Sequence, residues 1–420
     1  MTKVAIDSGD TAWLIVSSAL VLLMTPALAL FYGGMVRRKN VLSTLMYSIA
    51  AIPVISVAWA FWGYSLAFGA SWHGVIGGLD RMGLAGLAGQ THGSVPALAF
   101  VAFQMMFAVI TPALISGAFA ERMRFSAYLA FILAWSTLVY DPVAHWVWAD
   151  GGWLATLGAL DFAGGTVVHL TAGVSALVCA LVIGRRLGYP KHHVAPHDLT
   201  MTLTGAGLLW FGWFGFNAGS ALTSGQLASL AFVVTHLGAA GGALGWLVIE
   251  WKHRGKPTAL GVASGLVAGL VAITPAAGYV APWAAIAIGF IASVVCYGAV
   301  IMKGRLGYDD TLDAFGVHGV GGLSGALLTG VFAEKALNPA GADGALFGNV
   351  RQLGVQALAC AATGIYAAVV TYAILRVIDA LMGLRVPEAE EREGLDATQH
   401  GEEAYGDEAS SGMSAAMDEG

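Results

Sequence analysis

The chain has 420 residues, of which 57% are hydrophobic and only 11% are charged, and its mean hydropathy is +0.72. These values exclude an ordinary soluble domain, in which about a quarter of the residues are charged, and predict an integral membrane protein. The net charge of −6 belongs largely to the tail, because many of the acidic residues lie after residue 387, and no nucleic-acid partner is predicted. The three cysteines lie in separate apolar runs without metal-site spacing, so no disulfide framework, metal site or cofactor is predicted.

Eleven apolar runs are long enough to cross about 30 Å of hydrocarbon as helices. They cover residues 11–35, 42–68, 95–118, 125–146, 164–184, 199–218, 226–250, 258–275, 281–302, 313–332 and 350–383. The prediction is therefore an all-α membrane protein with eleven transmembrane helices, in which residues 1–383 form the transmembrane domain. Gly261, Gly265 and Gly269 repeat at four-residue spacing, which is typical of helices that pack closely in lipid.

The first run contains "LIVSSALVLLMTPALA", which resembles the apolar core and small-residue cleavage site of a signal peptide. Only Lys3 precedes this core as a basic residue, and Arg37, Arg38 and Lys39 follow where a span would end. We therefore interpret residues 11–35 as the first span, with N-terminal processing as the alternative interpretation.

Basic residues predict the orientation of the spans. Lys and Arg gather in the segments that follow odd-numbered spans, and the other side holds only Lys3, Arg81, Lys335 and Arg351. Because cytoplasmic loops retain an excess of basic residues, we expect a multi-pass protein of the cell (inner) membrane. Its N-terminus would lie outside and its C-terminus in the cytoplasm.

Two segments on different spans repeat one pattern. "HLTAGVSAL" begins at His169 and "HGVGGLSGAL" at His318, and both have a glycine at +4 and a serine at +6. Asp161 and Asp310 each lie eight residues before the histidine. The fifth and tenth spans enter the membrane from opposite sides, so the pattern predicts an inverted repeat of spans 1–5 and 6–10, with one extra helix. Such repeats place the substrate site near the membrane midplane.

Ionisable residues within spans are functional candidates, because burying one in lipid costs about 2.5–3.5 kcal/mol on insertion scales. The alternative interpretation of His169 or His318 is a neutral side chain that bonds to a neighbouring helix carbonyl. Their equivalent repeat positions instead favour a shared role in a pore or a ligand site. Asp161 precedes the Gly164-Gly165 pair at the start of a span, so we expect it to cap that helix.

Seven further stretches carry a recognisable set of motifs. They are "FYGGMVRRKN" (31–40), "FQMMFAVITPALISGAFAERMRF" (103–125), "ALDFAGGTVVH" (159–169), "GWFGFNAGS" (212–220), "TPAAGY" (274–279), "DAFGVHGVGG" (313–322) and "GLRVPEAEEREGLDATQHGEEAY" (383–405). Together they resemble the Amt/Mep/Rh ammonium transporter family, and its bacterial Amt branch in particular. The resemblance implies an ammonium-transporter fold, a homotrimer with one hydrophobic pore in each subunit, and transport rather than an enzymatic reaction.

The resemblance also implies an outer site that recruits ammonium. Its residues would be Phe107 and Trp148, whose rings face the cation, and Ser220, whose hydroxyl accepts an N–H bond. Asp161 would support this site structurally. Aromatic faces attract a cation without carrying a full charge.

Below that site, the resemblance implies that the stacked rings of Phe107 and Phe216 gate the pore. His169 and His318 would be a hydrogen-bonded pair that lines the constriction. The same motifs indicate three pore-adjacent residues: Phe103, Gln104 and Trp213. An apolar pore excludes bare cations, whereas ammonium can release its proton and continue as ammonia.

Residues 384–420 are predicted to be a cytoplasmic regulatory tail, in which "EAEEREGLD" forms a short solvated helix and 406–420 is disordered. The resemblance extends to residue 405 and implies a tail that packs under neighbouring subunits and helps to dock a PII-type signal protein. Mere solvation of an acidic tail is the alternative.

Two other functions stay open from the sequence. Transmembrane histidines could ligate haem in a redox protein. The chain could also be an ammonium sensor with incidental transport, although the segment after residue 383 is too short for the signalling domain that such sensors append.

Overall fold

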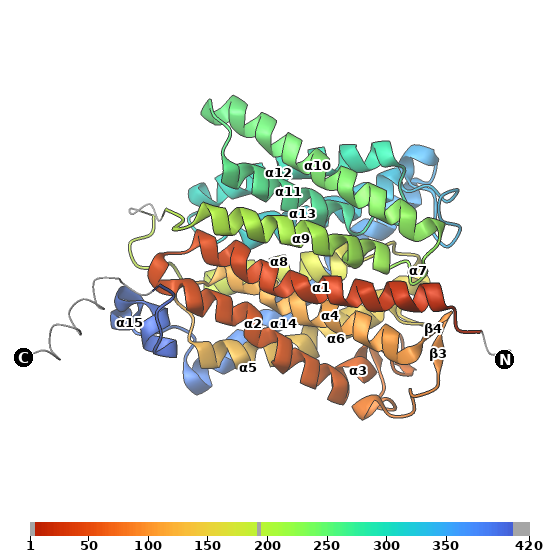
Figure 1. Cartoon of the computed structure of the whole chain (residues 1–420), viewed down its shortest axis with the longest axis horizontal. Coiled ribbons are helices and arrows are strands. Elements are labelled where there is room, and N and C mark those ends of the chain that lie inside the picture. Colours follow the sequence, from red (N-terminus) through yellow and green to blue (C-terminus); the bar gives the residue numbers. More distant parts are fainter. Residues whose placement is uncertain (1–4, 191–194, 406–420) are drawn as a thin grey trace, which may run out of the picture.

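The computed structural model describes residues 5–190 and 195–405. Within these residues, ten segments are helical, long and apolar enough to cross a membrane, and α11 (Ala259–Ile273) is a shorter apolar helix among them. Each of the eleven coincides with a predicted apolar run, which confirms an all-α membrane fold. The helices lie side by side in one bundle (Figure 1).

The first half of the chain forms the first five spans and two small hairpins. Its α-helices are α1 (Ser8–Met35), α2 (Val41–Ala58), α3 (Tyr64–Phe68), α4 (Ala97–Ile115), α5 (Phe125–Trp135), α6 (Asp141–Trp148), α7 (Trp153–Leu157) and α8 (Thr171–Ile183). Short 3₁₀ or π segments adjoin them at η1 (Arg38–Asn40), η2 (Trp59–Gly63), η3 (Met82–Leu84), η4 (Ser116–Ala118), η5 (Ser136–Tyr140) and η6 (Gly165–Leu170). The antiparallel hairpins pair β1 (Ser71–Trp72) with β2 (Ile76–Gly77), and β3 (Thr91–His92) with β4 (Val95–Pro96).

The second half forms six spans and the tail. Its α-helices are α9 (Leu199–Gly219), α10 (Gln226–Arg254), α11, α12 (Pro282–Leu306), α13 (Val320–Phe332), α14 (Val350–Met382) and, in the tail, α15 (Glu388–Glu393). The shorter segments are η7 (Phe315–Gly319), η8 (Ala345–Phe347) and η9 (Asp396–His400). The first helices of the two halves, α1 and α9, pack against each other along the bundle (Figure 1).

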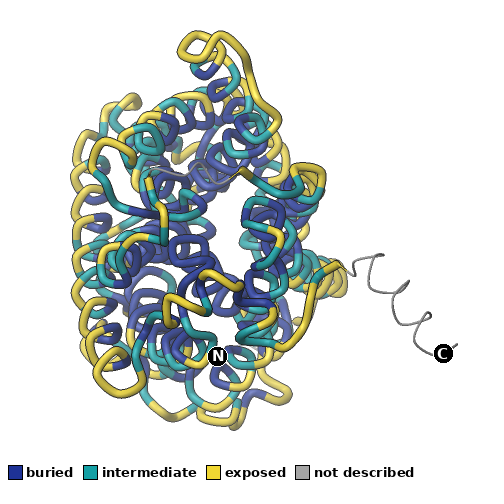
Figure 2. The backbone as a smooth tube through the Cα atoms, turned by 90° about the vertical axis from the view of Figure 1, so that its left-hand side faces the viewer, coloured by how far each residue is buried: buried dark blue, intermediate teal, exposed yellow. Residues whose placement is uncertain are grey.

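Glycines allow the helices to approach closely, as their spacing predicted. A Cβ on Gly269 of α11 would lie only 2.3 Å from the Gly238 oxygen of α10, and one on Gly242 would lie 2.4 Å from the Gly265 oxygen. Any side chain at these points would push α10 and α11 apart. Buried residues face the interior of the bundle, while exposed residues lie on its outside and at its ends (Figure 2).

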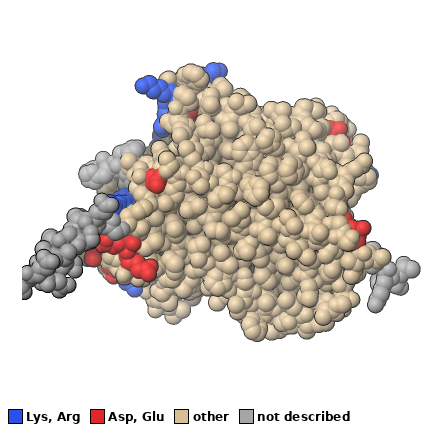
Figure 3. Space-filling model, in the orientation of Figure 1, with Lys and Arg blue, Asp and Glu red and all other residues tan. Residues whose placement is uncertain are grey.

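The two ends of the bundle differ in charge. We call the end that carries Arg37, Arg122, Arg186 and Arg305 the basic end, and the tail lies there as well (Figures 1 and 3). The N-terminus of α1 and the two hairpins lie at the opposite end (Figure 1).

The predicted short tail helix is present as α15, and most of its residues are exposed, but the tail is not merely solvated. Glu391 in α15 and Asp396 in η9 are both buried. The carboxylate of Asp396 accepts hydrogen bonds from the backbone N–H groups of Leu42 and Ser43, at 3.0 and 2.8 Å. These groups belong to the first turn of α2, where unpaired N–H groups and the helix dipole favour an anion. The tail is thereby bound to the transmembrane domain of its own chain, and residues 406–420 lie outside the described residues.

Candidate functional site

Asp161 caps the helix that carries His169, as the sequence predicted. Its carboxylate accepts hydrogen bonds from the backbone N–H groups of Gly164, Gly165, Thr166 and Val167 at 2.6–3.2 Å, and from the Thr166 hydroxyl. One buried side chain therefore satisfies four N–H groups that the start of a helix leaves unpaired. Gly164 adopts φ 112° at this turn, a conformation that favours glycine.

Asp310 plays the equivalent part in the second repeat. Its carboxylate accepts hydrogen bonds from the N–H groups of Ala314 at 3.1 Å and Phe315 at 2.8 Å. His169 lies in the π segment η6 and His318 in the π segment η7, each directly before an α-helix. The sequence pattern thus reflects one local structure used twice.

The glycine at +4 in each pattern marks where these two helices cross. A Cβ on Gly173 would lie 2.0 Å from the Gly319 nitrogen, and a Cβ on Gly322 would lie 2.7 Å from the Gly165 oxygen. The contact is reciprocal, because each glycine meets the backbone of the other repeat's π segment. It brings the two buried histidines together in the middle of the bundle.

The imidazole rings of His169 and His318 are buried and nearly parallel, with centroids 5.4 Å apart and an interplanar angle of 16°. Among the residues that the structure describes, neither nitrogen of His169, nor Nδ1 of His318, has a hydrogen-bond partner. The hydrogen bond between the rings that the resemblance implied is therefore absent here.

Aromatic rings continue the line of histidines toward the opposite end of the bundle. His169 stacks on Phe216, with centroids 5.9 Å apart, and the Phe216 and Phe107 rings lie 4.2 Å apart at 33°. Trp148 meets Phe107 edge-on at 5.9 Å. Its indole N–H donates to the Asp161 backbone oxygen at 2.9 Å, so the capping aspartate also holds this ring in place.

The remaining predicted residues lie around this line. Trp213 stacks on His169 at 5.4 Å and donates to the Thr274 hydroxyl at 2.9 Å. Phe103 is buried and meets Phe107 edge-on at 4.9 Å. The Ser220 hydroxyl donates to the Phe216 oxygen at 2.8 Å, which leaves its own oxygen able to accept.

Gln104, also predicted beside the pore, is buried, and its Oε1 has no hydrogen-bond partner among the described residues. Its place in the pathway stays a prediction.

Three cavities lead from the Phe216 ring to the basic end. The first, about 10 Å³, is lined by His169, His318, Trp213, Phe216 and apolar side chains. The second, about 40 Å³, shares His318 with the first and reaches Asp313. The third is a vestibule of about 430 Å³ that also contains Asp313 and opens at the basic end.

Sequence reasoning missed the contribution of α1 to this pathway. Leu28 and Phe31 line the narrowest cavity, and Met35 lines the vestibule. An apolar side chain in a transmembrane helix has the same sequence signal whether it faces lipid, a neighbouring helix or a pore. Only the packing of α1 against α9 reveals this role.

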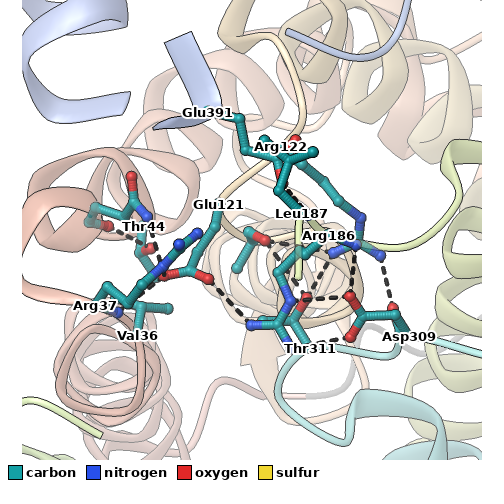
Figure 4. Close-up of polar contacts among 12 residues, drawn as sticks. Val36, Arg37, Thr44, Glu121, Arg122, Arg186, Leu187, Asp309, Thr311 and Glu391 are labelled. Atoms are coloured by element: carbon teal, nitrogen blue, oxygen red, sulfur yellow. Dashed lines mark hydrogen bonds and ion pairs between the residues drawn. The ribbon is translucent and has the colours of Figure 1, made fainter. Parts of the chain in front are cut away.

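A network of buried charges borders the vestibule (Figure 4). The Glu121 carboxylate is fully buried and forms ion pairs with Arg37 at 2.9 Å and Arg186 at 3.0 Å. Arg186 also pairs with Asp309 at 2.9 Å. Burial alone would raise the pKa of Glu121, but the charges and hydrogen bonds of Arg186 and Arg37 outweigh it and hold this pKa below its usual value.

Arg122 joins the same network through backbone oxygens. It donates to Gly184 at 2.9 Å, Ala118 at 2.9 Å and Asp309 at 2.6 Å. The tail contacts the network too, because Glu391 accepts from the backbone N–H group of Leu187, next to Arg186, at 2.7 Å. Segments from both repeats and from the tail are thus tied together at the basic end.

Comparison with known proteins agrees with this geometry. A family model described as Ammonium Transporter Family matches residues 12–405. An ammonium transporter of Bacillus subtilis is 52% identical over 403 residues, which cover 95% of this chain and 99% of the relative. An ammonium transporter of Aquifex aeolicus is 50% identical over 410 residues, which cover 96% and 95%. The crystal structure of Saccharomyces cerevisiae Mep2 is 39% identical with a TM-score of 0.85, and the match covers 91% of each chain. The chain therefore belongs to the ammonium transporter family.

Proposed function

We propose that this chain carries ammonium across the membrane by the following route. Trp148, Phe107 and Ser220 recruit the cation, the Phe107–Phe216 pair gates the entrance, and ammonia passes His169 and His318 into the vestibule. The continuous line of rings from Trp148 to His318 supports this order.

The size and polarity of the passage support loss of a proton on the way. Beside the histidines the cavity of about 10 Å³ has room for roughly one water-sized molecule. Apolar walls leave a bare cation without ligands, which is costly for ammonium and potassium alike. Ammonium differs from potassium because it can release a proton and continue as a neutral molecule.

The observation that carries the proposal is the pair of ring nitrogens on His169, which have no hydrogen-bond partner within residues 5–190 and 195–405. A buried polar group without a partner costs about 1–3 kcal/mol, so a fold that keeps one here has a use for it. A small molecule in the adjoining cavity would supply the missing partner. Neutral imidazoles can both donate to and accept from ammonia.

The same cavity argues against the haem alternative. The two histidine rings lie 5.4 Å apart and nearly parallel, and the space beside them is about 10 Å³. A porphyrin bound between them would require the two helices to separate. Their close contact at Gly173 and Gly322 opposes such a separation.

We further propose a homotrimer in the cell membrane, with the basic end in the cytoplasm and residues 384–405 as a regulatory tail that a PII-type protein engages. Glu391 accepts a hydrogen bond from Leu187, which lines the vestibule, and Asp396 binds the first turn of α2, so the tail is tied to the transmembrane domain beside the vestibule, which supports a coupling role. Asp396→Asn should weaken co-purification with a PII-type protein. Binding equal to that of the wild type would refute this role.

The main experiment measures current on solid-supported membranes after an ammonium jump. Replacing both His169 and His318 by Leu should abolish ammonium-driven charge movement in a correctly assembled protein, and His169→Asp should let potassium compete. His145→Leu is the matched control, because His145 is buried and bonds to Ser71 and Ala67 instead. It should lower stability and leave selectivity unchanged. Wild-type current and potassium rejection in the double variant would show that the histidines do not set selectivity.

A further inference from the structure

The turn that follows α9 carries Ser220 and contains a strained residue. Leu222, two residues after Ser220, adopts φ 56°, a left-handed conformation that a bulky side chain avoids. A strained backbone of this kind persists only where neighbouring contacts hold it, and such residues gather at ligand sites. In this turn the holding contacts come from α1.

Two side chains of α1 bind the turn on either side of Ser220. The Trp13 indole N–H group donates to the Ala218 backbone oxygen at 3.2 Å. The Asp10 carboxylate accepts from the Ser224 backbone N–H group at 2.8 Å and from the Ser224 hydroxyl at 3.1 Å. Asp10 and Trp13 are three residues apart, so they lie on the same side of α1. The turn is thus held at both ends.

The same side of α1 packs directly against the residue before Ser220. Ser17, four residues after Trp13, is fully buried. A Cβ on Gly219 would lie 2.6 Å from Cβ of Ser17 and 2.7 Å from the Phe103 ring. The start of the turn is therefore fixed by packing and by Trp13, whereas its far end is bound by Asp10.

Asp10 connects the turn to one further segment. Its Oδ2 atom accepts from the Ser94 hydroxyl at 2.5 Å, and Ser94 lies between β3 and β4. The hairpin and the start of α1 lie together at the end opposite the basic end (Figure 1). One carboxylate thus joins α1, a hairpin and the turn that carries Ser220.

We propose that Asp10 is a positioning residue for Ser220. By holding the strained turn, it keeps the Ser220 hydroxyl where its hydrogen is donated to Phe216 and its oxygen can accept an N–H bond from ammonium. This inference rests on the proposed recruitment of ammonium by Ser220. Asp10 acts through the turn and does not touch the cation, because its two carboxylate oxygens bind Ser224 and Ser94.

The test measures ammonium-driven current on solid-supported membranes and separates half-saturation from maximal current. Ser220→Ala should raise the half-saturating concentration about tenfold, because a hydrogen bond to a charged group is lost. Asp10→Ala should raise it less, about fivefold, because the hydroxyl stays present but is no longer fixed. The maximal current of Asp10→Ala should be unchanged. The double variant should match Ser220→Ala alone, since both changes act through one hydroxyl.

Conservative variants separate positioning from attraction of the cation by the charge of Asp10. Asp10→Asn keeps an acceptor oxygen for the Ser224 N–H group and should stay close to wild type. Leu222→Asn should restore part of the affinity lost in Asp10→Ala, because asparagine tolerates the left-handed conformation. Asp343→Ala is the matched control, since Asp343 has the same charge and accepts from the Lys335 backbone N–H group at 2.8 Å in another turn. It should leave half-saturation unchanged.

Amide hydrogen exchange measures the turn without ammonium. The backbone N–H groups of Ala221 and Leu222 bond to oxygens of the preceding turn at 3.3 and 2.9 Å. They should exchange faster in Asp10→Ala and at the wild-type rate in Ser220→Ala. This readout tests the positioning even if the proposed recruitment is wrong.

Three results would overturn the positioning role. They are wild-type exchange in Asp10→Ala, equal losses of affinity in Asp10→Asn and Asp10→Ala, and additive losses in the double variant with Ser220→Ala. The last two would show that the charge of Asp10 acts on the cation independently of Ser220. Unchanged half-saturation in Ser220→Ala itself would instead refute the recruitment of ammonium by this hydroxyl.

Discussion

The helix start at Asp161 and the helix start at Asp310 use one local design in different surroundings. In both, an aspartate caps a π segment that carries a buried histidine. The Asp161 carboxylate accepts from four N–H groups and a hydroxyl, and its backbone oxygen also binds the Trp148 indole. The Asp310 carboxylate accepts from two N–H groups, and its backbone oxygen accepts from Lys303 at 2.7 Å.

The surroundings of the two histidines also differ. His169 is covered by the Phe216 and Trp213 rings, whereas His318 borders a cavity that leads to the vestibule. Repetition therefore builds the centre of the pathway, and helices outside the repeated motif close one side and open the other. The difference between the two sides of the pathway therefore comes from helices outside the repeated motif.

The largest expected effect comes from removing the caps. Asp161→Ala should lower the free energy of unfolding by about 3–5 kcal/mol, because several buried N–H groups lose their acceptor and each costs about 1–3 kcal/mol. Asp310→Ala, with fewer donors, should cost about half as much. Thermal unfolding of both variants in detergent measures the difference.

Asp161→Asn and Asp310→Asn are the matched controls, since each keeps one acceptor oxygen in place. They should recover part of the lost stability. If Asp310→Ala destabilised the protein as much as Asp161→Ala, the two caps would be equivalent in energy, which would contradict the proposed difference between them.

The next effect concerns the charge network at the basic end. Glu121→Gln should lower stability at neutral pH by about 3 kcal/mol, because a buried ion pair loses one partner. The pKa of Glu121 is lowered in the folded state, so its stabilising contribution is present at neutral pH. That contribution is lost as the pH falls through the lowered pKa. The gap between wild type and variant should therefore shrink on acidification.

Unfolding midpoints measured from pH 7 to pH 3 check this expectation. Glu388→Gln is the control, because Glu388 forms an exposed pair with Arg392 that should contribute no more than about 1 kcal/mol. A gap between wild type and Glu121→Gln that stays constant over this range would contradict the assigned charge state.

The smallest effect is expected at the covered side of the pathway. Trp148→Leu should raise the ammonium concentration that gives half-maximal current by about five- to thirtyfold. This change corresponds to the loss of about 1–2 kcal/mol of cation–π attraction. Trp148→Phe keeps an aromatic face but loses the bond to the Asp161 oxygen. The Phe variant should stay close to wild type if the ring recruits the cation, and should resemble the Leu variant if the N–H bond alone matters. Concentration dependence of the current separates the two.

Much of this architecture was predictable because lipid imposes simple rules. Every span had to be a long apolar helix, so the eleven runs predicted the observed helices closely. The equal spacing of Asp161 and Asp310 from their histidines predicted the repeat. The tail was less predictable, since nothing in an acidic segment indicates that Glu391 and Asp396 would be buried against N–H groups.

The sequence by itself determined the number of spans, the cap at Asp161 and the pairing of the repeats, because these depend on local hydropathy and on hydrogen bonds within a few residues. Only the tertiary structure decided that the histidine rings lie parallel, that Leu28 and Phe31 line the passage, and that Glu121 pairs with Arg37 and Arg186. These features join residues far apart in the chain. Their geometry follows from how closely the helices pack, which the order of the residues alone does not specify.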